Sequence, residues 1–113
     1  MVHRNYLTSH RRRYALSEEE LANLCGYVSR AAVHRFEQGL RIPTLRFVIA
    51  CELIFGEHPR RLFPSLYERV EDEVLGHAAK LDAAIRDKKT KTAARQRELL
   101  LGIAHRAGST QEA

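Results

Sequence analysis

Signals that start helices recur along this chain at short intervals, whereas signals for strands are nearly absent. Ser17 precedes three glutamates, so its hydroxyl can accept a hydrogen bond from the Glu20 amide while the Glu20 side chain reaches back, which is a capping box. Ser29 and Thr44 are suitable caps for two further helices. No segment alternates apolar and polar residues for long. The sequence therefore predicts an all-α protein.

Glycines mark the expected ends of the first two capped helices. The first is expected to end at Gly26 and the second at Gly39. The second carries Val33 and Phe36 on one face, where they can pack against the first helix. Two capped helices and a glycine turn within residues 16–43 have the spacing of a helix-turn-helix.

Two more helices are expected before the chain breaks again. Residues 45–55 are apolar almost all round, which predicts a helix at the centre of the core. Pro59 suits the first turn of a short helix through Phe63. With a helix before Ser17, these elements make a five-helix domain.

The C-terminal part is predicted to hold one long helix and a shorter one. Ser65–Glu68 reads as another capping box, and an apolar stripe spaced mainly by fours predicts a helix from there to about Arg86. A polar linker at 87–92 precedes a last helix at 93–106, which would carry on one face Leu99, Leu100, Ile103 and Ala107. The expected organisation is a helix-turn-helix domain at 1–63, a helical extension at 64–107 whose apolar stripe needs a partner surface, and a disordered tail at 108–113.

The charge of the chain is positive and unevenly placed. There are 19 Lys and Arg against 14 Asp and Glu, a net charge of +5. Residues 1–46 hold eight basic and four acidic side chains, residues 47–79 three and six, and residues 80–113 eight and four. A basic chain favours a polyanionic partner, nucleic acid first, and the uneven distribution predicts a local anion-binding surface.

Several classes of protein are disfavoured by the composition. No apolar run approaches the roughly 18 residues that span a bilayer, and the N-terminus lacks the apolar stretch of a secretory signal. Cys25 and Cys51 lie among apolar neighbours, so we expect buried thiols in a reducing cytoplasm. The histidines show no metal-ligand spacing, and no nucleophile motif or phosphate-binding glycine loop is present. We expect no metal, no cofactor and no enzymatic activity.

A polar face lies opposite Val33 and Phe36 on the second capped helix. It offers guanidinium groups that can donate two bonds to guanine and an alanine methyl that can meet a thymine methyl. His34 has two equal interpretations: it contacts a base edge, or it is an exposed histidine without a function. The side chains on this face are Arg30, Ala31, His34, Arg35 and Gln38.

The same segment resembles the Cro/repressor-type (xenobiotic-response-element-like) helix-turn-helix family of phage and bacterial regulators. The resemblance extends more loosely from Asn5 to Phe63. The matching motifs are Leu16-Ser17-Glu18-Glu19-Glu20-Leu21-Ala22, Gly26, Ser29-Arg30, Phe36-Glu37-Gln38-Gly39 and Pro43.

The resemblance implies a recognition helix, Ser29–Gln38, in the major groove of double-stranded DNA. It assigns base reading to Arg30, Ala31 and Arg35, with His34 beside them, and phosphate contact to Ser29, Gln38 and Arg41. Arg12 belongs to the run Arg11–Arg13, which suits phosphate binding and an ordinary helix face equally. Glu37 is expected to form a buried pair with an arginine of the first helix.

Two features depart from the family pattern. Glu18 stands where the family has a glutamine that touches phosphate, and an ionised carboxylate would repel phosphate, so that role is not transferred. Six residues separate Gly26 from Val33, where the family usually has five. The extra residue lies in Tyr27-Val28 and predicts a longer turn.

These observations predict a sequence-specific transcription regulator, of the repressor kind, that binds a palindromic operator as a homodimer through its C-terminal helices. The alternative is a protein-interaction module, such as an antitoxin-like component, whose basic segment 88–113 binds a partner protein. The Lys88-Lys89-Lys91 stretch, within the basic segment 86–97, has a further reading as a solvated linker or as additional phosphate contacts.

Overall fold

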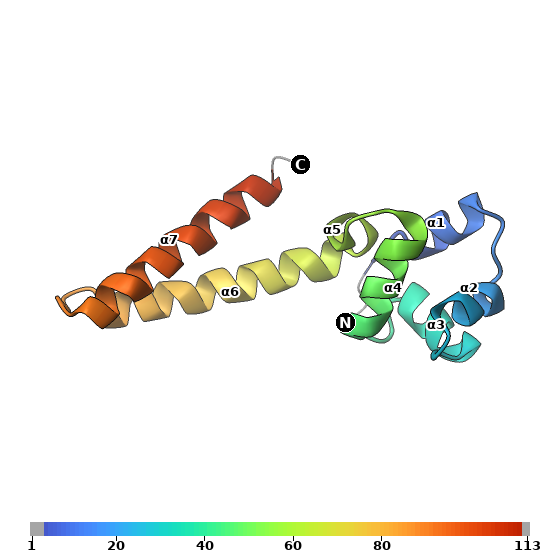
Figure 1. Cartoon of the computed structure of the whole chain (residues 1–113), viewed down its shortest axis with the longest axis horizontal. Coiled ribbons are helices and arrows are strands. Elements are labelled where there is room, and N and C mark those ends of the chain that lie inside the picture. The colour runs from blue at the N-terminus through green and yellow to red at the C-terminus, as the bar shows by residue number, and fades with distance from the viewer. Residues whose placement is uncertain (1–3, 112–113) are drawn as a thin grey trace. The chain divides into compact units, whose positions relative to one another are not determined.

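The computed structural model describes residues 4–111 and the side chains of residues 4–107 (Figure 1). Within this part of the chain it contains seven α-helices and no strand, which confirms the all-α prediction. The helices are α1 Leu7–Arg13, α2 Glu18–Cys25, α3 Arg30–Glu37, α4 Leu45–Phe55, α5 Pro59–Leu62, α6 Pro64–Ile85 and α7 Lys91–Gln111. None of them combines the length and the apolar character needed to cross a membrane.

The predicted caps are present at the starts of three helices. The Ser17 hydroxyl accepts a hydrogen bond of 3.0 Å from the Glu20 amide, and the Glu20 carboxylate accepts one of 2.9 Å from the Ser17 amide. Ser29 and Thr44 cap α3 and α4 through the amides three residues on. Each cap satisfies a backbone donor that the first helical turn leaves unpaired.

The core of the first five helices forms where α3 packs on α2 and α4. Val33 and Leu21 are fully buried, and Phe36 packs against Phe47 with ring centroids 4.5 Å apart. Gly26, at the end of α2, has a φ of +85°, which glycine adopts without the steric strain of a side chain. Residues 26–29 connect α2 to α3, and α3 packs against the core through its apolar face.

Helix α4 is not central, contrary to the prediction from its composition. Its buried residues, Phe47, Cys51 and Phe55, lie four apart on one face. On the opposite face Leu45 is 75% exposed and Leu53 is 81% exposed. Composition counts apolar side chains, but it does not say whether another element of the same chain covers both faces of a helix.

The two cysteines lie within or beside this core. Cys51 is buried and Cys25 is half-buried. Burial raises the pKa of both thiols above the ordinary value. Each thiol is therefore held in its neutral form at neutral pH.

The long helix α6 begins earlier than its predicted cap. Pro64 opens it, and the Tyr67 amide bonds to the Phe63 carbonyl, so Ser65 and Glu68 lie inside the first turns and form no capping box. Proline has a backbone angle that suits a first helical position, and it needs no donor there. The predicted end near Arg86 agrees with the observed end at Ile85 within one residue.

The last helix is longer than residues 93–106. Thr90 caps it by accepting a hydrogen bond of 3.1 Å from the Ala93 amide. Thr90 lies in the predicted linker, so its role as a helix cap was missed. It runs to Gln111, because adding a residue to an existing helix costs less than starting one. Residues 108–111 of the expected disordered tail are thus helical, and residues 112–113 lie outside the described part.

The second compact unit, residues 69–113, contains α7 and most of α6. Ile85 and Ala93 are buried near the connector, and Arg97 donates hydrogen bonds to the backbone carbonyls of Ile85 and Lys88. These bonds satisfy carbonyls that the end of α6 leaves unpaired. Of the four residues expected on one face of α7, Leu99 is 57% exposed, Leu100 and Ile103 are half-buried, and Ala107 is buried.

Candidate nucleic-acid interface

Helix α3 has one buried and one exposed face. Ala32, Val33, Phe36 and Glu37 are buried. The residues between them in sequence turn outward, because helical positions separated by three and four share a face. The exposed face carries all four predicted base readers, Arg30, Ala31, His34 and Arg35.

The arginines assigned to DNA contact are available as donors. Arg30 and Arg35 on α3 and Arg41 in the following connector are exposed, and none pairs with an acidic side chain within residues 4–107. Arginine keeps its charge at any relevant pH, so each guanidinium can donate to guanine or phosphate oxygens.

His34 differs from its neighbours because it has a partner. Its Nδ1 atom lies 3.0 Å from Oε2 of Glu18 in the first turn of α2, with the His34 side chain 56% and the Glu18 side chain 18% exposed. Burial alone would raise the pKa of Glu18, but the hydrogen bond and charge of His34, with Arg11 nearby, hold it below its ordinary value. The acidic residue that departs from the family pattern thus bonds to α3.

Glu37 joins the end of α3 to α1, as the sequence predicted. Its Oε2 accepts a hydrogen bond of 2.6 Å from Arg11 Nε, and its Oε1 accepts one of 2.9 Å from Thr8. Arg11 also donates to the Leu16 carbonyl at 2.8 Å, beyond the end of α1. The arginine run therefore divides: Arg11 is buried and structural, whereas Arg12 is exposed and retains its candidate phosphate role.

The turn with the extra residue is attached to α4. The Tyr27 hydroxyl lies 3.2 Å from Oγ1 of Thr44, the cap of α4, and the guanidinium of Arg46 lies 4.2 Å from the centre of the Tyr27 ring. Sequence reasoning missed Arg46 as a candidate phosphate contact. The available signal was the inserted tyrosine itself, because an aromatic ring in a polar turn needs a surface to cover it.

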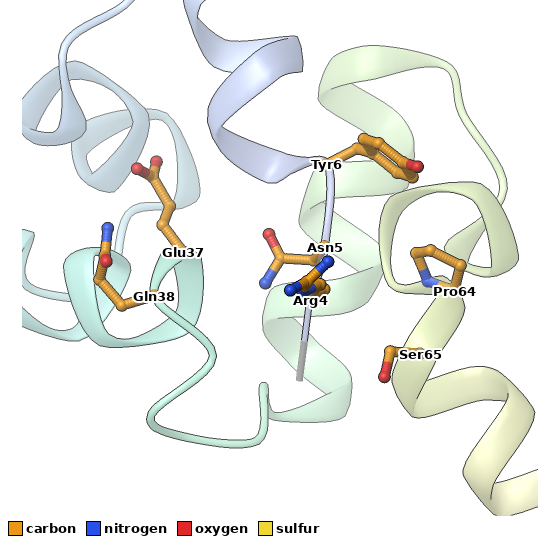
Figure 2. Close-up of a pocket in the computed structure, with 7 residues that line it drawn as sticks. All are labelled: Arg4, Asn5, Tyr6, Glu37, Gln38, Pro64 and Ser65. Atoms are coloured by element: carbon orange, nitrogen blue, oxygen red, sulfur yellow. The ribbon is translucent and has the colours of Figure 1, made fainter. Parts of the chain in front are cut away.

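The remaining predicted phosphate contacts lie at the two ends of α3. The Ser29 hydroxyl accepts the cap hydrogen bond from Ala32 at 3.1 Å and keeps its own hydrogen for donation. Gln38, at the other end, is exposed beside a hollow of about 390 Å³ (Figure 2). Figure 2 shows Arg4 and Asn5 between Gln38 and the start of α6, so Arg4 adds a positive charge that the motif did not assign.

The hollow itself offers little chemistry. Its carboxylate, Glu37, is occupied by Arg11 and Thr8, and Asn5 donates its amide hydrogen to the Phe36 carbonyl at 2.9 Å. Across the described residues, no three histidine, cysteine or acidic side chains lie close enough together to hold a metal ion. The geometry instead concentrates exposed cationic donors around α3.

Comparison with known protein families gives a match to the N-terminal part of the chain. Residues 9–62 match the model of a helix-turn-helix family of the Cro/C1 type. No curated protein and no solved structure matches the chain significantly. The matched segment covers the five-helix region that carries the two capped helices, the glycine turn and the exposed basic face. Through residues 9–62 the chain belongs to the Cro/C1-type helix-turn-helix family of DNA-binding transcription regulators.

Proposed function

We propose that this protein recognises a specific double-stranded DNA sequence by placing α3 in the major groove. The observation that carries the proposal is the exposed face of α3, where Arg30 and Arg35 are unpaired with acids in the described part of the chain while Val33 and Phe36 fix the opposite face to the core. A rigidly backed helix that presents free guanidinium groups suits base reading in a groove about 12 Å wide.

The roles divide between bases and phosphates. Arg30, Ala31, His34 and Arg35 face the bases. Donors at both ends of α3 and on nearby elements position the helix on the backbone, which fixes register without reading sequence. The proposed phosphate contacts are Ser29, Gln38, Arg41 and Arg12.

We further propose that the protein acts as a homodimer through α6 and α7. Val70 and Val74 on α6 are 48% and 43% exposed, and Leu99 and Leu101 on α7 are 57% and 73% exposed. Apolar side chains in this number need a covering surface, and a second copy provides one. Two recognition helices then read two half-sites of a palindromic operator.

Repression is the mode of regulation that this architecture supports most simply. A dimer that occupies an operator excludes other proteins from the same DNA, which requires no further activity. A reporter gene behind the selected operator tests this, and an increase in transcription on adding the protein would contradict it.

Selection of bound sequences from random duplexes tests the DNA proposal. We expect a palindrome, with binding that weakens steeply as salt rises because phosphate contacts release counterions. Arg30→Ala or Arg35→Ala is expected to cost about 1–3 kcal/mol at the cognate site and to relax specificity. Arg61→Ala, which removes an arginine that pairs with Glu57 away from α3, serves as the control. Binding that ignores both sequence and salt would contradict the proposal.

Sedimentation or light scattering tests the dimer. A monomer at high micromolar concentration would contradict self-association. The exposed leucines of α7 would then be a binding surface for a different protein. The antitoxin-like alternative then predicts that a chain without residues 88–113 loses a co-purifying protein but keeps its affinity for DNA half-sites.

A further inference from the structure

We propose that Glu18 fixes the tautomer of His34, so that His34 accepts a hydrogen bond from the amino group of adenine or cytosine. The inference rests on the proposed major-groove function of α3 and names the base chemistry at one of its positions. It assigns a specificity role to Glu18, which lies on α2 and not on the recognition helix.

The first step is the contact between the two side chains. His34 Nδ1 lies 3.0 Å from Glu18 Oε2, a hydrogen-bond distance. An ionised carboxylate can only accept, so the hydrogen must be on Nδ1. In a neutral imidazole the other nitrogen, Nε2, then carries a lone pair and no hydrogen.

The second step is that Glu18 stays ionised and in place. Its side chain is only 18% exposed, and it lies in the first turn of α2. The positive end of the helix dipole favours an anion at this position. The partner that selects the tautomer is therefore a fixed anion.

The third step is where the free nitrogen can act. The His34 side chain is 56% exposed and lies on the same face of α3 as Arg30 and Arg35. In the major groove, adenine N6 and cytosine N4 donate hydrogens, whereas guanine and thymine present acceptor oxygens. A bare Nε2 matches the first pair and repels the second.

The exposed face of α3 therefore carries two kinds of hydrogen-bonding side chain: arginines that donate and a histidine nitrogen that accepts. Arg30 and Arg35 can only donate, so they select guanine. Without Glu18, the His34 ring could adopt the other tautomer, with its hydrogen on Nε2. That nitrogen would then donate a hydrogen bond to guanine. With Glu18, the face prefers guanines at the arginine positions and an amino-bearing base at the His34 position.

The test combines a spectroscopic and a binding measurement at about pH 8, above the ordinary imidazole pKa of about 6.5. The ¹⁵N chemical shifts of the His34 ring report which nitrogen carries the hydrogen, with no DNA present. Affinities for duplexes with each base substituted at each half-site position report base preference. The variants are His34→Ala, Glu18→Gln and, as the matched control, Glu19→Gln, which removes the same charge from the next, exposed position of α2.

For the wild type and the Glu19→Gln control we expect a hydrogen on Nδ1 and a preference of about five- to tenfold for adenine or cytosine at one half-site position. His34→Ala should lose that preference at that position and keep those due to the arginines. Glu18→Gln can both donate and accept, so it should populate both tautomers and weaken the same preference.

Three results would overturn the inference. A hydrogen on Nε2 in the wild type, or no change in any base preference in His34→Ala, would remove it while leaving sequence-specific binding intact. Equal weakening in Glu19→Gln would assign the effect to charge and not to the contact. A wild type without any base preference would remove the proposed function itself, and the ring spectrum would still report the tautomer separately.

Discussion

At the scale of single residues, the Arg11–Glu37 pair is the most demanding feature of the domain. The Glu37 side chain is 1% exposed, and the hydrogen bond to Glu37 raises the pKa of Arg11. Two charges removed from water are stable only while each satisfies the other, so losing one partner leaves an uncompensated buried charge. The pair connects α1 to the end of α3.

We predict that Glu37→Gln destabilises the fold by about 3 kcal/mol, because Arg11 keeps its charge without a counterion. Urea denaturation followed by circular dichroism measures the loss. The double variant Arg11→Met with Glu37→Leu should recover most of it, since it leaves no buried charge. An unchanged midpoint in Glu37→Gln would mean that water already reaches this pair.

The glutamates that begin α2 predict how stability depends on pH. The cap hydrogen bonds from Ser17 lower the pKa of Glu20 from 4.5, and the pKa of Glu18 lies below the same value despite its burial. A carboxyl whose folded pKa is depressed stabilises the fold at pH values above its unfolded pKa and loses that contribution as the pH falls through the folded pKa.

We therefore expect the free energy of unfolding to fall as the pH drops below about 4.5 and to change little from these two groups above about pH 5.5. Urea titrations at a series of pH values measure this. In Glu18→Gln, the slope of the free energy of unfolding against pH should decrease below about pH 4.5. A slope that is identical in the variant would show that Glu18 does not contribute.

At the scale of helices, the turn between α2 and α3 accommodates its extra residue by attaching to α4. We propose Arg46 as a further phosphate contact, held in place by the Tyr27 ring on which its guanidinium lies. Tyr27→Ala should then weaken specific DNA binding and lower the slope of log affinity against log salt by up to about one. Tyr27→Phe keeps the ring, so it should keep the slope. Titrations by fluorescence anisotropy at several salt concentrations separate the two, and equal slopes in all three proteins would contradict an Arg46–phosphate contact.

The helices were predictable where a local signal sets them, and less so where distant packing decides. Ser17, Ser29 and Thr44 are caps in the sequence and in the structure because a cap depends on neighbours within three residues. The burial of α4 depends on what covers Leu45 and Leu53, and no local pattern states that. The exposed face of α3 followed from Val33 and Phe36, since the opposite side of an amphipathic helix is fixed once its buried side is known.

The contacts of the candidate site were harder to foresee than its faces. Glu37 could be paired with the first helix from the family pattern, but its partner, Arg11, is one of three consecutive arginines. Glu18 and His34 are 16 residues apart, and Tyr27 and Thr44 are 17 apart. Such hydrogen bonds form only after the helices have packed. The periodicity of the sequence therefore does not predict them.

At the scale of the whole molecule, the chain divides after Glu68 into two compact units. The buried core of the first unit ends at Phe63, with Leu66 packed against its edge. The apolar contacts that fold the DNA-binding part are thus all present before the division. The second unit then supplies the surfaces proposed for self-association.

We predict that a chain ending at Glu68 keeps its fold and its affinity for a half-site. Its affinity for a full palindrome should fall by at least about 100-fold, because two linked recognition helices gain from a high effective concentration. Thermal unfolding and anisotropy with half-site and full-site duplexes measure these two properties. Equal affinities of the short and full chains for the palindrome would show that residues 69–113 do not pair the recognition helices.

The buried thiol of Cys51 has a consequence for stress signalling. Peroxide and other oxidants react with thiolates, and thiolates are scarce when burial keeps a cysteine protonated. A regulator that responds to oxidative stress through its own cysteines needs a reactive, accessible thiolate. The core of this protein withholds the Cys51 sulfur from that chemistry, whereas Cys25 is only half-buried.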